Sequence, residues 1–290
     1  MRKGFSAQQH TRQSQGKGIR ESTARSRVGG AITVAVSSLI ICLCVVLVAF
    51  SMAYFLSPVD GPSMKQTINA EYTNDNPKNT DSVIVSKNNN PENVARGDII
   101  ITRFYDKEGK GDYVDENGKK YKLFIKRLIA KEGDTLTFVQ KDDDNDYNGH
   151  RYQIEVNGVP INESYLDPIW GRNIPFDGIY NFINSGGVGG SVDSAWRSDF
   201  KKFIQEVYYP NGLTRYEIVL PKGYWFFMGD NRGGDGSPEM YNIRSWDCTA
   251  FGPQLMANFV GKIVEIIPNS KSLTTYAFEK MFDWLTFNWD

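Results

Sequence analysis

The sequence predicts a mostly β protein, in which one N-terminal membrane-spanning helix precedes an antiparallel β domain that carries an inserted α+β segment. Three observations predict this class. Residues 28–59 contain no charged side chain, which is typical of a membrane span. From about residue 96 onward, short runs rich in β-branched and aromatic residues alternate with turn pairs such as Gly-Asp and Asn-Gly. The 290 residues are 40% hydrophobic, enough for a folded core of one or two domains.

The N-terminal region has a strong charge asymmetry. Residues 1–27 carry seven Lys or Arg and one acid, so we expect a flexible basic tail in the cytoplasm. The anchor follows at 28–57, with its helix at about 31–56 and the remaining chain outside the membrane. A cleaved signal peptide is the main alternative, and Ser51-Met52-Ala53 loosely resembles a cleavage site. Because the apolar region of such peptides is usually only ~7–15 residues, we favour an uncleaved anchor over this reading and over a buried core helix.

The β domain is expected over residues 58–268. An insertion at about 141–215 interrupts it, with Gly186–Gly190 as a hinge and Ala195–Val207 as a helix. Residues 269–290 have near-helical apolar spacing and predict an amphipathic helix. The predicted strands are Ser82–Ser86, Asp98–Phe104, Tyr121–Ala130, Thr135–Val139, Tyr152–Val156, Tyr216–Leu220, Tyr224–Met228 and Phe259–Ile267.

Composition excludes several classes of function. The 33 basic and 34 acidic residues nearly cancel, whereas a nucleic-acid-binding protein usually carries a strong basic excess. The two histidines, His10 and His150, lie far apart in polar surroundings, so we expect neither a histidine triad nor a metal site. No cofactor is expected. The three cysteines suggest no disulfide framework.

Ser63 is the candidate nucleophile. It stands in Asp60-Gly61-Pro62-Ser63-Met64, a few residues after the predicted span, where Gly and Pro favour a turn. A turn can expose the hydroxyl and leave neighbouring N–H groups free for an oxyanion. From these residues alone, an ordinary serine in a juxtamembrane turn is the favoured reading.

Lys126 is the candidate general base, because neither histidine is well placed. A free lysine has a pKa of ~10.4, which burial among apolar groups can lower by up to ~3–5 units. Lys126 lies in an apolar strand and shares one face with Phe124 and Leu128. The alternative is a strand-edge lysine whose amine reaches water.

Taken together, five blocks in this order resemble the bacterial type I signal peptidases, which are membrane-anchored Ser/Lys proteases, and the match covers residues 60–262. The blocks are Asp60–Ile68, Arg96–Ile100, Lys126–Thr135, Val156–Leu166 and Gly229–Lys262. The resemblance implies the signal-peptidase-like antiparallel β fold. It also implies exported preproteins with small residues before the cut as substrates, cleaved at the surface of the lipid bilayer. We expect a monomer and no nucleic-acid partner.

The resemblance also implies roles for individual residues. Ser63 would attack the scissile carbonyl, and its backbone N–H would help to form the oxyanion hole within a turn shaped by Gly61, Pro62 and Met64. Lys126 would act as general base and then as proton donor. Ser245 would orient the Lys126 amine. The supporting residues would be Asp247, Asp230 and Arg232.

The sequence departs from the family pattern at several positions. Gln66 replaces a usual proline, and Gly61 suggests the Gram-positive branch. Residues 233–244 separate Arg232 from Ser245, where the family has two residues, so Ser237 is a rival for the orienting role. Cys248 and Thr249 stand where Ser and Arg are usual. A catalytically degenerate homologue that binds exported proteins is therefore kept as an alternative, and a self-cleaving repressor-type protease is a more remote one.

Overall fold

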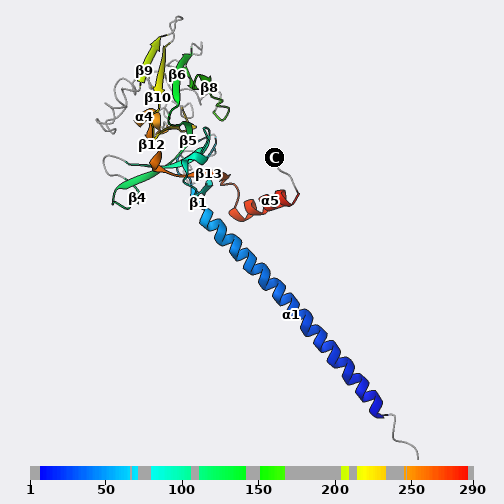
Figure 1. Ribbon diagram of the computed structural model, residues 1–290. Coiled ribbons are helices and arrows are strands. Elements are labelled where there is room, and N and C mark those ends of the chain that lie inside the picture. The colour runs from blue at the N-terminus through cyan, green and yellow to red at the C-terminus, as the bar shows by residue number, and fades with distance from the viewer. Residues whose placement is uncertain are drawn as a thin grey trace, which may run out of the picture. The chain divides into compact units, whose positions relative to one another are not determined.

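The computed structural model describes residues 7–65, 67–70, 80–105, 111–141, 151–166, 204–208, 214–232, 245 and 247–286. The chain divides into two compact units, Met1–Ala53 and Tyr54–Asp290 (Figure 1). The described part of the first unit is a single helix, and the second unit holds the strands. Expectations for Gly186–Gly190, Ser237, Gln66 and His150 lie outside the described residues.

Helix α1 spans Ala7–Ala53. Its segment Gly30–Ala53 has a mean hydropathy of 2.9 and none of it is buried, so by length and composition it could cross a membrane. Two expected boundaries are wrong. Residues 7–27, predicted as a flexible tail, are helical, since no proline precedes Pro58 to interrupt the helix. The helix also ends at Ala53 rather than at about 56.

Residues Tyr54–Pro58 form strand β1 instead of the last helical turn. Each of them pairs with the antiparallel strand β2, Ser82–Ser86, from Tyr54 opposite Ser86 to Pro58 opposite Ser82. Phe55 packs against a buried cluster that includes Val83 and Val85. This tertiary pairing, together with the bias of residues before proline against helix, overrides the apolar run.

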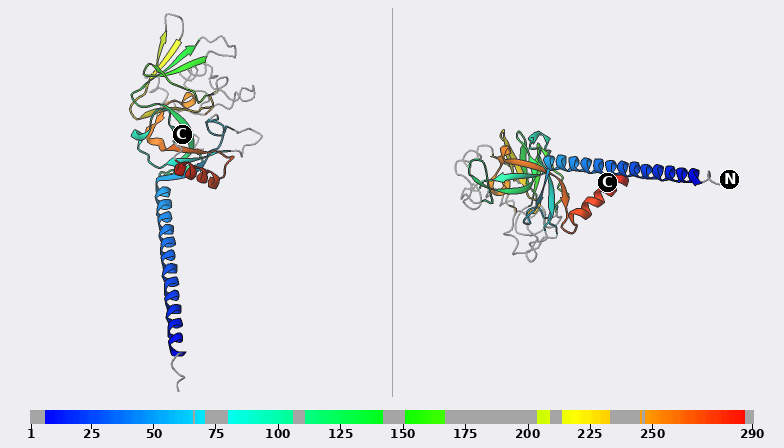
Figure 2. Two further views of the ribbon diagram at one scale, coloured as in Figure 1. Left: turned by 90° about the vertical axis from the view of Figure 1, so that its right-hand side faces the viewer. Right: turned by 90° about the horizontal axis from the view of Figure 1, so that it is seen from below.

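The larger of two sheets has eight strands in the order β1-β2-β13-β3-β5-β11-β12, with β4 paired to β5, and each neighbouring pair is antiparallel (Figures 1 and 2). The sequence predicted β2, β11 and β13 with the bounds that they have in the structure. It predicted β3 and β5 within two residues of their observed bounds, but missed β1, β4 and β12. The further strands are β3 (Ile99–Phe104), β4 (Tyr113–Val114), β5 (Lys120–Ala130), β11 (Tyr224–Met228), β12 (Gln254–Leu255) and β13 (Phe259–Ile267).

The second sheet has five strands in the order β8-β7-β6-β10-β9. Most of it comes from the predicted insertion, yet the expected helix Ala195–Val207 is wrong over 204–207, which lie in β9. Pairing with β10, from Thr214 opposite Tyr208 to Ile218 opposite Ile204, fixes this segment as a strand. The strands are β6 (Thr135–Lys141), β7 (Arg151–Val156), β8 (Val159–Pro160), β9 (Ile204–Tyr208) and β10 (Thr214–Val219).

One hydrophobic core joins the two sheets. Phe138 and Ile154 of the second sheet pack in the same buried cluster as Leu128 and Phe226 of the first. Helix α5 (Leu273–Thr286) follows β13 within the predicted C-terminal helix, and Tyr276 hydrogen-bonds to Glu265 of β13. The shared core makes β5 and β11, which border it, a rigid support for side chains at their ends.

Candidate active site

The Ser63 loop is a tight turn at the end of β1. Gly61 has φ +81°, a left-handed conformation that glycine adopts without strain. Lys65 N–H donates to Pro62 O at 2.9 Å and Ile68 N–H to Met64 O at 2.9 Å. Met64 is 1% exposed and Ile68 is fully buried. These two side chains anchor the turn in the core, whereas Ser63 itself is partly exposed.

Lys126 lies beside Ser63. Its Nζ is 2.9 Å from Ser63 Oγ and 2.9 Å from the carbonyl oxygen of Ile125, and the residue is only 3% exposed. Burial lowers the pKa of Lys126 to about 8, although the negative charges of Asp247 and Asp230 act in the opposite direction. The structure therefore brings together the two residues that the sequence singled out as nucleophile and base.

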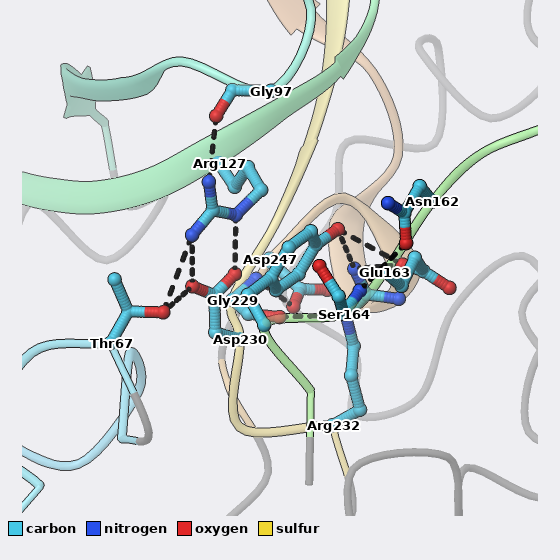
Figure 3. Close-up of polar contacts among 11 residues, drawn as sticks. Thr67, Gly97, Arg127, Asn162, Glu163, Ser164, Gly229, Asp230, Arg232 and Asp247 are labelled. Atoms are coloured by element: carbon cyan, nitrogen blue, oxygen red, sulfur yellow. Dashed lines mark hydrogen bonds and ion pairs between the residues drawn. The ribbon is translucent and has the colours of Figure 1, made fainter. Parts of the chain in front are cut away.

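Arg127, the next residue of β5, is held by carboxylate and carbonyl oxygens (Figure 3). Its Nε and Nη2 bind the two oxygens of Asp230 at 2.9 and 2.6 Å, and Nη1 donates to Gly97 O at 2.7 Å. Thr67 donates to the same carboxylate at 2.5 Å. A bidentate, buried pair of this kind fixes both partners. It ties the strand that carries Lys126 to the segment that follows Ser63.

Arg232 is the second buried arginine of the site. Its Nε donates to Gly229 O at 2.7 Å, and its Nη2 pairs with Glu163 at 2.7 Å (Figure 3). The ring of Tyr165 lies 3.8 Å from the Arg127 guanidinium carbon and its hydroxyl lies 3.4 Å from Arg232 Nη2. The predicted supporting residues Asp230 and Arg232 thus belong to one buried network with the segment 163–165.

Ser245 is buried next to the Ser63 loop, and only Gly229 lies between the two. A Cβ on Gly229 would lie 2.1 Å from Ser245 Oγ and 2.3 Å from Ser63 O. Such distances leave no room for any side chain but hydrogen. The described residues give Ser245 Oγ no hydrogen-bond partner. The structure therefore records no bond from Ser245 to Lys126, and the orienting role stays a prediction.

Asp247 lies in the same buried region. Its carboxylate accepts from Gly229 N–H at 2.9 Å, and from the N–H and hydroxyl of Thr249 at 3.0 and 2.6 Å. It caps helix α4, Cys248–Phe251. Thr249 thus supplies hydrogen bonds at the position where the sequence resemblance leads us to expect an arginine. Burial raises the pKa of Cys248, so this thiol stays protonated and packs in the core.

Several residues of this site were not predicted from the sequence as site residues. They are Thr67, Asn69, Arg127, Glu163, Tyr165 and Asn231. Arg127 and Asn231 adjoin predicted residues, so their positions were a usable signal, but their partners lie up to 169 residues away. No group of His, Cys, Asp and Glu among the described residues could hold a metal ion.

A serine hydroxyl in contact with a buried amine on a β scaffold is an arrangement that can support serine-protease chemistry. The model of the signal peptidase family, peptidase S26, matches residues 32–267. The chain therefore belongs to the signal peptidase family S26 and is a signal peptidase of the serine protease class. No curated protein matches it closely enough to count as a relative.

Among solved structures, the chain is similar to a signal peptidase I from Enterococcus faecalis V583. The two are 19% identical, and the match covers 59% of this chain and 96% of that chain with a TM-score of 0.25. The family assignment rests on the family model, which spans well over half of the chain.

Proposed function

We propose that this signal peptidase cleaves by a Ser/Lys dyad, with Ser63 as nucleophile and Lys126 as general base. The observation that carries the proposal is the 2.9 Å contact between Ser63 Oγ and the buried amine of Lys126. A carbonyl oxygen, that of Ile125, takes one N–H of the amine. In the neutral amine this leaves the lone pair free to accept the Ser63 proton.

In the proposed mechanism, Lys126 carries the proton in both halves of the reaction. Ser63 Oγ bonds to the scissile carbonyl carbon while its proton passes to Lys126 Nζ, and the carbonyl oxygen becomes an oxyanion that accepts from Ser63 N–H. The C–N bond then breaks and Lys126 returns the proton to the leaving amine. In the second half a water gives a proton to Lys126 Nζ and attacks the acyl carbon, the bond from that carbon to Ser63 Oγ breaks, and Lys126 returns the proton to Ser63 Oγ.

A free edge of β5 supports binding of an extended substrate next to the dyad. One side of β5 pairs with β3, and Leu128 makes its backbone bonds there, to Asp98 and Gly97. Alternate residues face opposite sides, so Leu123 and Ile125 turn their backbone groups away from β3. On that side β11 pairs from Arg127 onward, and β4 pairs with β5 only at Lys120 and Tyr121. Among the described strands, 122–126 are therefore open for peptide pairing.

We propose that the substrates are exported preproteins with small residues before the cut, a preference that follows from the family resemblance. Helix α1 would anchor the enzyme by its segment Gly30–Ala53, with residues 1–27 in the cytoplasm and the β domain outside. The seven basic residues of the tail support this orientation. Anchoring would hold Ser63 near the bilayer surface, where cleavage sites emerge.

Two experiments test these proposals. The purified full chain is incubated with one preprotein and the new N-terminus of the product is sequenced, with Ser63→Ala as the matched control. Cleavage by Ser63→Ala would refute the role of Ser63 as nucleophile, whereas binding without cleavage by the unaltered chain would favour the degenerate homologue.

Protease added to intact cells should digest the β domain and spare residues 1–27. A protected β domain would show that the orientation is the reverse of the proposed one.

A further inference from the structure

Two asparagines hold the carbonyl groups of the Ser63 loop. Asn69 Nδ2 donates to Val59 O at 3.1 Å and to Gly61 O at 2.9 Å. Asn231 Nδ2 donates to Pro62 O at 3.0 Å, and Asn231 N–H donates to Ser63 O at 3.2 Å. Four carbonyl groups between residues 59 and 63 are thus bound by only two side chains and one backbone N–H.

Asn69 is itself fixed in place. It is 1% exposed and has φ +60°, a left-handed conformation that asparagine tolerates better than most residues. It forms a reciprocal pair with Asp81, in which Asn69 N–H donates to Asp81 Oδ2 at 2.6 Å and Asp81 N–H donates to Asn69 Oδ1 at 2.6 Å. Its two side-chain N–H bonds therefore act from a rigid base.

Asn231 is fixed by its neighbours in sequence. It is 5% exposed and lies between Asp230, which pairs with Arg127, and Arg232, which pairs with Glu163. Both ion pairs are bonded at 2.6 to 2.7 Å. The two pairs hold the backbone of Asn231 in place, and the burial of its side chain restricts how far the amide can turn away from the loop.

The bond to Pro62 O has a consequence for the opposite side of the same peptide unit. A trans peptide is planar, and its C=O and N–H point in opposite directions. Holding the carbonyl of Pro62 thus fixes the direction of the Ser63 N–H. Within the described residues that N–H has no hydrogen-bond partner, which leaves it available for an incoming carbonyl oxygen.

We propose that Asn231 is a positioning residue for the transition state: by holding the Pro62 carbonyl, it aims the Ser63 N–H at the oxyanion, while Asn69 secures the start of the same loop. This inference rests on the proposed function, in which Ser63 is the nucleophile. Asn231 acts through the peptide unit 62–63 and does not touch the reacting atoms.

The expected effect is on kcat rather than on KM. Loss of one oxyanion-hole donor costs ~10²–10³ in kcat, and loss of its orientation costs part of that. Asn231→Ala is therefore expected to lower kcat by about 10- to 100-fold, with KM changed by less than about threefold. Asn231→Leu has nearly the size of asparagine but no donor, so it should behave like Asn231→Ala.

The experiment measures kcat and KM of the full chain in detergent micelles with a preprotein-derived peptide. A second readout is inhibition by the corresponding peptide aldehyde, whose adduct with Ser63 carries an oxygen at the oxyanion position. Asn231→Ala should weaken the aldehyde by the factor by which it lowers kcat. Asn157→Ala is the matched control, because Asn157 also bonds through its side chain, to Thr135 and Asp134, but in the second sheet.

The proposal is overturned if Asn231→Leu keeps its kcat, since filling the space would then suffice, or if Asn157→Ala lowers kcat and aldehyde affinity as much as Asn231→Ala. If Asn231→Ala does not fold, Asn69→Gly carries the test; it keeps the left-handed backbone and removes the amide, and a normal kcat would count against the proposal. Activity retained by Ser63→Ala would instead refute the proposed function.

Discussion

Lys126 and Arg127 are adjacent in β5, yet their electrostatic surroundings are opposite. Arg127 is paired in a bidentate bond with Asp230, with both side chains largely buried. Lys126 is more deeply buried, but its polar contacts are a hydroxyl and a carbonyl oxygen. The comparison teaches how one strand can be both stable and reactive: a paired cation holds the strand, and burial lowers the pKa of an unpaired cation, so that its amine loses the proton more readily.

The largest expected effect comes from removing the reactive half of this contrast. Ser63→Ala and Lys126→Met should each lower kcat/KM by about 10⁴-fold or more, because nucleophile and base act as a unit. Peptide cleavage by the purified variants measures this. Their circular dichroism should match that of the unaltered chain, and normal turnover by Lys126→Met would remove the contrast altogether.

The next largest effect concerns Arg127, the paired cation of this comparison. Arg127→Met should destabilise the β domain by about 3–5 kcal/mol, because it leaves the fully buried carboxylate of Asp230 without its cation. Urea unfolding followed by tryptophan fluorescence measures the change. Replacement of exposed Lys222 by Met provides the control and should change stability by less than about 0.5 kcal/mol. A similarly small effect of Arg127→Met would mean that the pair does not stabilise the strand.

Lys126→Met should act in the opposite direction on stability. The pKa of Lys126 is about 8 in the folded chain and ~10.4 when unfolded, so the unfolded state binds more protons between these values. Stability contributed by this group therefore rises with pH through that window. Below pH 8 the buried amine costs up to about 3 kcal/mol. Lys126→Met should recover part of this at pH 7, and the gain should vanish near pH 10.5; a constant or negative difference contradicts the assignment.

The pH dependence of cleavage sharpens the same point. A general base must be neutral, so kcat/KM should rise with pH and level off above about 8, the pKa of Lys126. Below that value the fall should be about tenfold per pH unit. A profile that is flat between pH 6 and 8 would show that Lys126 is not the titrating base.

The smallest expected effect concerns Ser245. Ser245→Ala should lower kcat/KM about tenfold, which corresponds to the ~1.4 kcal/mol of one hydrogen bond, the bond that the proposed orienting role requires between Ser245 and Lys126. Ser237→Ala should change it by less than about twofold. Parallel assays of both variants decide the matter, and a larger loss in Ser237→Ala would transfer the orienting role to that residue.

Periodicity and turn residues were sufficient for most of the fold. The strands β2, β11 and β13 have the predicted bounds, because alternating or continuous apolar runs between turn residues define them locally. Strand β1 was missed because its residues continue the apolar run of the span. The segment at β9 was misread as helical because its pairing with β10 is not a local property.

The candidate site divides in the same way. The turn after the predicted span made Ser63 a candidate and the apolar strand made Lys126 one, and the resemblance implied roles for Asp230, Arg232 and Asp247. The role of Arg127 could not be read from its position, because its partner Asp230 lies 103 residues further along the chain. The structure also gave Thr249, which departs from the family pattern, a defined contact with Asp247.

The sequence by itself determined the apolar segment long enough for a span, the β character of the domain and the residue types available for chemistry. These depend on composition and on short-range spacing, which a chain carries before it folds. Only the tertiary structure decided that the Lys126 amine contacts the Ser63 hydroxyl without a paired carboxylate, and that two asparagines hydrogen-bond to the carbonyl groups of the Ser63 loop. Desolvation and hydrogen-bond direction arise from groups far apart in sequence, so they exist only once the strands have paired.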